Sequence, residues 1–241
     1  MAKYNKKFLI PYYDTDVKGK LKPESVLSYM AETSSWHSDN VGVGHKLLNA
    51  NGYGWMLNRW EVEIYSLPSA KEEVTVQTWT SGFDKFYAER QFCMKDSSGA
   101  DIAKASTQWI FLEMGKKRPR RVPDEIKEKY NFINEMNFSE YTELKPFDFE
   151  PGKIITTRRS DIDNNNHVNN IRYVEWMFEG IPQADIINKE LFKIAIKFNK
   201  EIRLGDEVAT FAIADSDKTT AYRHIISVKG EINAIGYTEW K

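Results

Sequence analysis

An internal repeat restricts the fold of this chain more than any other feature of its sequence. Residues recur between the two halves at one constant spacing (161 − 14 = 147 positions). The recurring pairs are Asp14 with Asp161, Asp16 with Asp163, Leu21 with Val168, Met30 with Met177, and Glu32 with Glu179. A repeat of this length indicates two copies of one structural unit. Further along the chain the spacing falls (207 − 73 = 134), so the first copy carries a longer insertion, which we place at the glycine-rich residues 41–54.

Each copy combines one helix-forming segment with several strand-forming segments. Helical spacing of apolar residues predicts a helix over residues 23–40, with Pro23 in its first turn, and a second helix over 170–179, which Gly180 ends. Strand-forming residues separated by turn signals dominate the remainder. The predicted strands are 55–65, 73–80, 87–95 and 102–112 in the first copy, and a short strand to Arg158, then 191–202, 207–214, 219–229 and 232–240 in the second.

This order of elements predicts an α+β protein with a tandem hot-dog fold, in which each half is a long helix wrapped by a curved antiparallel β-sheet. A tandem Greek-key barrel or an α+β sandwich would contain a similar number of strands, so the periodicity alone does not decide. We expect an N-terminal hot-dog half over residues 1–113, a basic linker over 114–150, and a C-terminal hot-dog half over 151–241. A tandem chain supplies its own pairing of units, so a monomer is viable, and a homodimer stays open.

Composition excludes several classes of protein. The single cysteine, Cys93, rules out an intrachain disulfide framework and a cysteine-rich zinc site, and it favours a reducing compartment, with the cytoplasm as the expected location. No stretch approaches the roughly 18 uninterrupted apolar residues of a membrane helix, so we expect no membrane insertion. The first residues are basic, but no long apolar run follows them, so we expect mature sequence rather than a signal peptide. The Lys-, Asn- and Ile-rich composition suggests a bacterial protein.

The expected linker begins with a dense run of positive charge. This run consists of Lys116, Lys117, Arg118, Arg120 and Arg121. Such runs are commonly solvated linkers, but they also steer acidic partner proteins. The formal net charge of −1 and the lack of an aromatic-interleaved basic motif argue against a nucleic-acid partner.

The densest polar cluster, residues 161–170, directly precedes the second predicted helix. A calcium loop would need glycine at its sixth position and a bidentate glutamate at its twelfth, where this chain has Asn166 and Arg172. We therefore predict no metal site. We also expect no cofactor. The cluster can also be explained as an Asn-rich turn that caps a helix. However, the first copy has Lys18, Gly19 and Lys20 where the second has Asn165, Asn166 and His167, and this asymmetry favours one active half.

Three motifs together resemble a known family. The pattern D-x-N-x-H-V-x-N-x-x-Y occurs as Asp163, Asn165, His167, Val168, Asn170 and Tyr173. The segment Trp55-Met56-Leu57-Asn58-Arg59-Trp60 enters the first meander, and the basic run ends in Arg120-Arg121-Val122-Pro123-Asp124-Glu125. In order and spacing these resemble the acyl-acyl-carrier-protein (acyl-ACP) thioesterases, which are tandem hot-dog proteins. The resemblance extends from about Tyr4 to about Ala214.

The resemblance implies an active site made of Asp163, Asn165 and His167, with a glutamate on the following long strand, which is Glu201 in this chain. Plant members follow that glutamate with a cysteine once proposed as a nucleophile, whereas this chain has Ile202, so a thiol mechanism there is impossible. Cys93 lies in an alternating strand of the first half, where we expect a packed core residue. No Gly-x-Ser-x-Gly elbow offers a serine. The remaining chemistry is attack of water on a thioester carbonyl.

Roles for these residues follow as hypotheses. Glu201, if desolvated beside an acyl tunnel, would accept the proton of the water. Asn165 would hold the water or the carbonyl, and His167 would orient, donate to the leaving thiolate or share the role of base. Asp163 would fix the histidine tautomer or anchor the loop. Backbone N–H groups at the start of the helix, those of Val168, Asn169 and Asn170, are candidate oxyanion donors.

The implied reaction is hydrolysis of fatty acyl-ACP to free fatty acid, with the acyl carrier protein as partner and the basic run as its docking surface. In this family the aromatic-lined cavity of the first half receives the acyl chain, and we expect Trp36, Trp55, Trp60 and Trp79 in the core. We expect His37, His45 and His224 to be surface or core residues without a catalytic role. Two alternatives stay open, an acyl-CoA thioesterase on the same scaffold and a non-catalytic acyl-binding protein.

Overall fold

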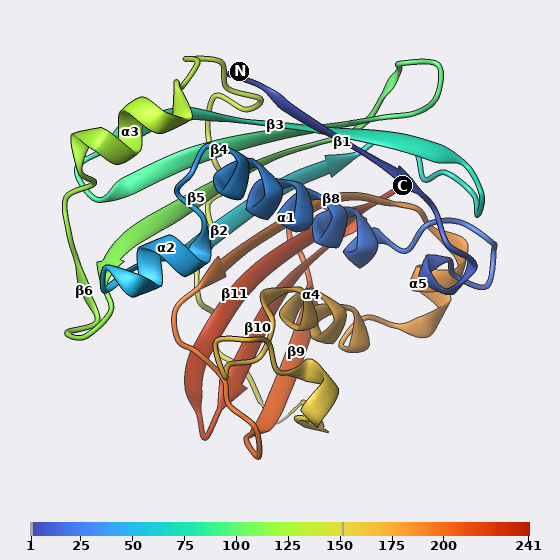
Figure 1. Ribbon diagram of the computed structural model, residues 1–241. Coiled ribbons are helices and arrows are strands. Elements are labelled where there is room, and N and C mark those ends of the chain that lie inside the picture. Colours follow the sequence, from blue (N-terminus) through green and yellow to red (C-terminus); the bar gives the residue numbers. More distant parts are fainter. Residues whose placement is uncertain (1, 151) are drawn as a thin grey trace. The chain divides into compact units, whose positions relative to one another are not determined.

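The two copies of the repeat fold into two units, residues Met1–Glu140 and Tyr141–Lys241, each of which pairs an antiparallel sheet with helices (Figure 1). The structure, a computed structural model, describes residues 2–150 and 152–241. In the first unit the strand order is β1-β3-β4-β5-β2, with β6 paired to β5. In the second unit the order is β8-β11-β10-β9-β7. All of these pairings are antiparallel, as the meander pattern predicts.

The first unit follows the predicted order of strand, helix and meander. Its strands are β1 (Tyr4–Leu9), β2 (Tyr53–Ile64), β3 (Glu73–Asp84), β4 (Tyr87–Lys95), β5 (Asp101–Glu113) and β6 (Arg118–Pro119). Its helices are α1 (Pro23–Asn40), α2 (His45–Ala50) and α3 (Asp124–Tyr130), and a 3₁₀ turn covers Tyr12–Asp14. The short helix α2 occupies the insertion expected at residues 41–54. Residues 114–140 belong to this unit, since β6 pairs with β5 and the Ile133 N–H donates to the carbonyl of Thr80.

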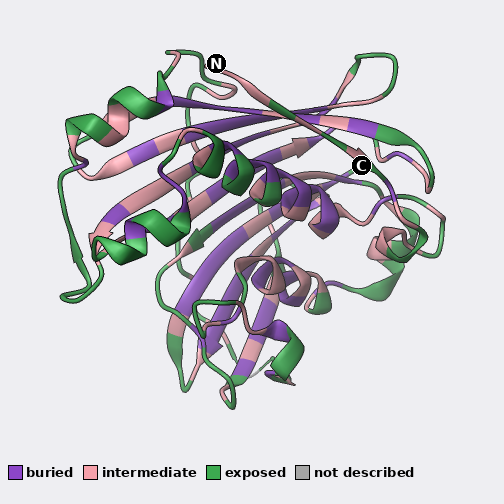
Figure 2. Ribbon diagram, in the orientation of Figure 1, coloured by how far each residue is buried: buried purple, intermediate pink, exposed green. Residues whose placement is uncertain are grey.

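Helix α1 lies against β1 and β3 and buries its apolar face there. Leu27 and Met30 are both fully buried, and Figure 2 shows buried positions along α1 alternating with exposed ones. The expectation for Trp36 is wrong, because its side chain is 52% exposed. Its indole N–H donates to Glu32, and the ammonium group of Lys6 lies 4.3 Å from the ring centroid. An indole that finds polar partners on the surface need not enter the core.

The second unit contains the shorter copy of the repeat. Its strands are β7 (Lys153–Thr156), β8 (Leu191–Phe198), β9 (Glu207–Ala214), β10 (Ala221–Val228) and β11 (Glu231–Trp240). Its helices are α4 (Asn170–Glu179) and α5 (Gln183–Asn188), and a 3₁₀ turn covers Arg159–Asp161. Strand β8 ends at Phe198, earlier than the predicted Ile202. The reason is that the N–H groups of Asn199 and Lys200 both donate hydrogen bonds to the carbonyl of Asn233, at 2.8 and 3.1 Å.

Local structure repeats at the spacing found in the sequence. The 3₁₀ turns Tyr12–Asp14 and Arg159–Asp161 correspond, and so do the isolated bridges Thr15 with Leu21 and Ile162 with Val168. At the matching turn position the backbone is left-handed in both copies, with φ of 70° at Gly19 and 62° at Asn166. Glycine and asparagine are the residues that tolerate this conformation best. The two copies therefore share backbone geometry at the loop where their side chains differ most.

No helix within the described ranges is both long and apolar enough to cross a membrane.

Candidate active site

The loop before α4 is shaped by the carboxylate of Asp163. One carboxylate oxygen accepts from the backbone N–H of Asn165 at 2.8 Å, and the other lies 3.5 Å from the side-chain amide nitrogen of Asn165. The Asp163 N–H donates to the carbonyl of His167 at 2.9 Å, which closes the turn. Of the two roles considered for Asp163, the geometry supports anchoring of the loop, because its carboxylate contacts Asn165 rather than the imidazole.

The side chains of His167 and Glu201 contact each other beside this loop. The Nε2 atom of His167 lies 3.0 Å from Oε2 of Glu201. The side chain of His167 is 23% exposed and that of Glu201 is 41% exposed, so water reaches both. A carboxylate oxygen only accepts hydrogen bonds, so Nε2 carries a proton in this contact. The other ring nitrogen, Nδ1, is then the imidazole atom that can accept a proton.

Glu201 is placed by a loop after β8, not by a strand as expected. The Val168 N–H donates to the carbonyl of Ile202 at 2.9 Å, which ties this loop to the start of α4. Asn233 on β11 also contacts this loop. The register shift between β10 and β11 leaves Asn233 without a partner residue on β10. Its side-chain amide lies 3.5 and 3.4 Å from the carbonyls of Lys200 and Glu201. Bulges of this kind often redirect backbone next to functional sites.

A buried aspartate, Asp161, binds two arginines next to the loop. It is fully buried and accepts from the backbone N–H of Arg158 at 2.8 Å and from its guanidinium at 3.0 Å, while Arg172 lies 3.5 Å away. Burial acts to raise the pKa of this carboxyl, but the hydrogen bonds and charges of the two arginines outweigh it, and the pKa is lowered. The sequence singled out Asp161 through the repeat and as the first residue of the polar cluster 161–170. Its arginine partners gave no signal that could be separated from ordinary surface charge.

The start of α4 supplies fewer free donors than the sequence suggests. The N–H of Val168 donates to Ile202 and that of Asn169 donates to the carbonyl of Asp161 at 2.8 Å. The side chain of Asn169 caps the helix by accepting from the N–H of Ile171 at 2.9 Å. Of the three expected backbone donors, two are thus already used, and only the N–H of Asn170 stays a candidate.

The basic run forms a hairpin turn at the end of β5. Lys116 and Arg120 both approach Glu113, at 3.0 and 3.6 Å, and the Arg120 guanidinium lies 5.1 Å from the ring centroid of Tyr53. All five basic residues are exposed. We refer to residues 116–121 as the basic hairpin. It carries a local excess of positive charge on the first unit.

The remaining candidates of the sequence have structural roles. Cys93 is buried, its thiol lies 3.1 Å from a carboxylate oxygen of Asp101, and burial together with this hydrogen bond raises the thiol pKa to about 11. The expectation of a packed cysteine is confirmed. His37 and His224 are buried, and burial lowers the pKa of each, to about 4 and about 3. His45 lies on α2, with Nε2 3.2 Å from the amide of Asn49.

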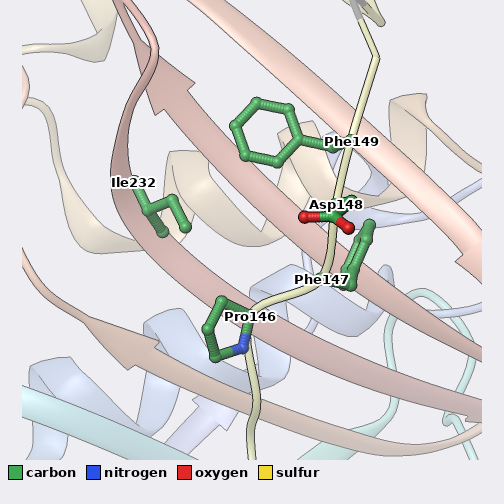
Figure 3. Close-up of a pocket in the computed structure, with 5 residues that line it drawn as sticks. All are labelled: Pro146, Phe147, Asp148, Phe149 and Ile232. Carbon is green, nitrogen blue, oxygen red and sulfur yellow. The ribbon is translucent and has the colours of Figure 1, made fainter.

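A pocket of about 410 Å³ opens in the second unit (Figure 3). It is lined by Pro146, Phe147, Asp148, Phe149 and Ile232. Arg223 stacks on Phe147 at 5.1 Å, and Phe149 packs on Phe211 at 4.5 Å, so the segment that forms the pocket is held by aromatic contacts. Asp148 is the one ionisable residue in its lining. None of the predicted site residues lines this pocket.

Within residues 2–150 and 152–241, no group of three or more His, Cys, Asp or Glu side chains is arranged to hold a metal ion.

Comparison with solved structures defines the fold class. An acyl-ACP thioesterase from Bacteroides thetaiotaomicron matches with a TM-score of 0.92 at 23% identity, covering 100% of this chain and 98% of that one. The 12:0-ACP thioesterase from Umbellularia californica matches with a TM-score of 0.87 at 20% identity, with the same coverage. The predicted α+β tandem hot-dog fold is confirmed.

The family follows from sequence profiles. The acyl-ACP thioesterase N-terminal domain matches residues 1–130, and the acyl-ACP thioesterase C-terminal domain matches residues 148–241. The chain belongs to the acyl-ACP thioesterase family. The chloroplastic oleoyl-acyl carrier protein thioesterase of Coriandrum sativum is 24% identical over 96% of this chain. This chain spans 68% of the length of that relative and 52% of a palmitoyl-acyl carrier protein thioesterase of Arabidopsis thaliana.

Proposed function

We propose that this protein hydrolyses the thioester of fatty acyl-ACP and releases free fatty acid and holo-ACP. The observation that carries the proposal is the His167–Glu201 contact of 3.0 Å beside a loop held by Asp163. The first copy of the repeat keeps the loop geometry but has Lys20 where His167 stands. Membership of the acyl-ACP thioesterase family supports the substrate class.

The proposed reaction starts with a water molecule activated by His167. Nδ1 of the imidazole takes a proton as the water oxygen attacks the thioester carbonyl, and the carbonyl electrons move to the oxygen. Glu201 accepts the Nε2–H hydrogen bond and stabilises the imidazolium that forms, a role like that of the carboxylate in hydrolytic triads. Collapse of the tetrahedral intermediate breaks the C–S bond. The leaving thiolate takes the proton from the imidazolium, which regenerates the neutral base.

Charge that develops on the carbonyl oxygen needs hydrogen-bond donors. We assign this role to the side-chain amide of Asn165 and the backbone N–H of Asn170 at the first turn of α4. The amide is carried by a turn that Asp163 shapes, and a helix N-terminus favours negative charge. Asp163 acts as a positioning residue for both Asn165 and His167 in this scheme.

The basic hairpin is the proposed docking surface for the carrier protein. Complementary charge raises association rates and fixes orientation more than it raises affinity. All five of its cations are exposed, and two of them, Lys116 and Arg120, also face Glu113. A cytoplasmic location and a monomeric or homodimeric state stay predictions of the sequence.

The test is release of free thiol by the purified protein from matched acyl-ACP and acyl-CoA substrates of short, medium and long chain. Selective hydrolysis of the ACP esters, with loss of turnover in His167→Gln, supports the proposal. Equal or faster hydrolysis of CoA esters would make the protein an acyl-CoA thioesterase. Binding of acyl chains without turnover of any substrate would make it a non-catalytic acyl-binding protein.

A further inference from the structure

Tyr173 lies in the first turns of α4 and is 2% exposed. Its ring packs against Trp176 and makes an edge contact with Phe198, with centroids 5.6 and 5.3 Å apart. Its hydroxyl donates to the carbonyl of Lys200, the residue directly before Glu201, at 3.3 Å. The peptide group that precedes Glu201 is therefore held by one buried tyrosine.

The hydrogen bond from Tyr173 limits the conformational freedom of Glu201. Glu201 lies in a loop and is 41% exposed, so neither strand pairing nor burial fixes its carboxylate. A glutamate has three side-chain torsions, and each adds conformational entropy that must be lost in the productive geometry. Restricting the backbone next to Glu201 reduces the range of positions that its carboxylate samples. Removing the hydroxyl would take this donor away from the Lys200 carbonyl, which favours movement of the loop.

The repeat supplies an independent comparison. In the first copy the N–H of Leu21 donates to the carbonyl of Pro68 at 2.8 Å, and this bond corresponds to the 2.9 Å bond from Val168 to Ile202. By this correspondence Leu67 occupies the place of Glu201. At the spacing of the helices, Val26 occupies the place of Tyr173. The copy without the carboxylate thus has a buried valine where the other copy has the tyrosine.

We infer that Tyr173 is a positioning residue that holds Glu201 within hydrogen-bond reach of His167. The inference rests on the proposed function, since it assigns Tyr173 to the same site. The hydroxyl acts through the backbone of Glu201 and does not touch the reacting atoms. Asn233, which approaches the carbonyls of Lys200 and Glu201 from β11, is the second anchor of the loop.

The first experiment needs no turnover. The ring protons of the protein's four histidines are followed by NMR against pH in wild type, Tyr173→Phe, Glu201→Gln and Tyr222→Phe. The last variant is a matched control, because Tyr222 also lies in the second unit and donates its hydroxyl hydrogen bond to Asp185, away from Glu201. We expect Tyr173→Phe to shift the midpoint of the His167 titration toward the midpoint measured in Glu201→Gln. We expect Tyr222→Phe to leave the midpoint at its wild-type value. An unchanged titration in Tyr173→Phe would overturn the inference.

The second experiment uses acyl-ACP hydrolysis. We expect Tyr173→Phe to lower kcat roughly tenfold with KM within about twofold of wild type, because a misplaced catalytic group lowers the rate without altering ground-state binding. A wild-type protein that shows no turnover contradicts the proposed function and leaves the titration as the test of the anchor. Melting curves identify any variant that fails to fold. In that case Asn233→Ala removes the second anchor and is read by the same titration, with the same outcome overturning the inference.

Discussion

Nε2 of His167 lies 3.0 Å from Oε2 of Glu201, and the two residues come from separate loops of the second unit. The link between these loops is a backbone hydrogen bond from Val168 to Ile202, the residues that directly follow the pair. The repeated unit thus provides the scaffold, since an equivalent bond joins Leu21 to Pro68 in the first unit. The side chains placed on these two loops differ between the copies.

Glu201→Gln should keep the fold and remove most of the activity. The amide retains the size of the carboxylate but cannot stabilise an imidazolium, so we expect kcat to fall at least about 100-fold. Glu231→Gln is the matched control, because Glu231 is an exposed glutamate of the same unit that pairs with Lys200. Steady-state hydrolysis of acyl-ACP measures both. Comparable rates in the two variants would remove Glu201 from the mechanism.

Asn166 should tolerate glycine and resist valine. Its φ of 62° is left-handed, and the equivalent position of the first copy is Gly19 with φ of 70°. A β-branched residue in this conformation costs about 1–2 kcal/mol, whereas glycine adopts it freely. We expect Asn166→Val to lower the free energy of unfolding by that amount in urea titrations and to lower kcat, because it distorts the turn between Asn165 and His167. Asn166→Gly should keep the free energy of unfolding and kcat near their wild-type values. Equal values for the glycine and valine variants would show that the left-handed backbone at Asn166 does not matter.

Much of this architecture could be predicted from the sequence. Helices α1 and α4 and strands β4 and β9 begin and end at the predicted residues, because Pro23, Gly180 and clear turn signals mark their boundaries. The pairing of His167 with Glu201 followed from the family resemblance rather than from spacing. It depends on two loops that are distant in the sequence and are joined by the hydrogen bond from Val168 to Ile202.

Other features had no signal in the sequence. The early end of β8 depends on the carbonyl of Asn233, which lies on another strand at a register shift. Occupation of the Val168 and Asn169 N–H groups likewise depends on carbonyls brought in by the fold. Tyr173 matched the family motif, but the role that we infer for it depends on its hydrogen bond to the Lys200 carbonyl. Non-local hydrogen bonds of this kind have no periodicity to detect.

Acid should destabilise the protein through its buried histidines. Desolvation, with the charge of Arg90, lowers the pKa of His37 from 6.5 to about 4, and desolvation lowers that of His224 from 6.5 to about 3. Between these values and 6.5 the unfolded chain binds more protons than the folded one, so stability falls as pH drops through this range. Between pH 7 and pH 4.5 the free energy of unfolding should fall in both proteins. We expect the fall to be about 2 kcal/mol smaller in His37→Gln than in wild type. His45→Gln, an exposed histidine of the same unit, is the control.

This prediction is measured as the difference between urea unfolding curves at the two pH values. Comparing each variant with wild type cancels the contribution of carboxyls such as Asp161, whose lowered pKa acts in the same direction at lower pH. The guanidinium of Arg90 lies 3.0 Å from Nδ1 of His37 and can only donate, so Nδ1 is the acceptor and the ring is neutral. Glutamine preserves an acceptor there. A His37→Gln variant with the wild-type pH dependence would show that this histidine does not titrate on unfolding.

Reversing charge on the basic hairpin should affect carrier-protein esters selectively. The triple variant Lys117→Glu, Arg118→Glu and Arg121→Glu leaves Arg120 in place, because Arg120 stacks on Tyr53 and faces Glu113 and so supports the hairpin itself. If the hairpin docks an acidic carrier protein, KM for acyl-ACP should rise at least about tenfold, with little change in kcat.

The selectivity of the effect separates docking from a general charge effect. Acyl-CoA presents no protein surface, so its hydrolysis should change less than about twofold. A variant with the same charge change at three other exposed lysines of the first unit, Lys18, Lys46 and Lys71, should behave like wild type toward both substrates. Added salt should weaken the wild-type preference for acyl-ACP, since it screens exposed charges. An equal rise of KM in both charge-reversed proteins would mean that overall charge, and not the hairpin, governs the encounter with the carrier protein.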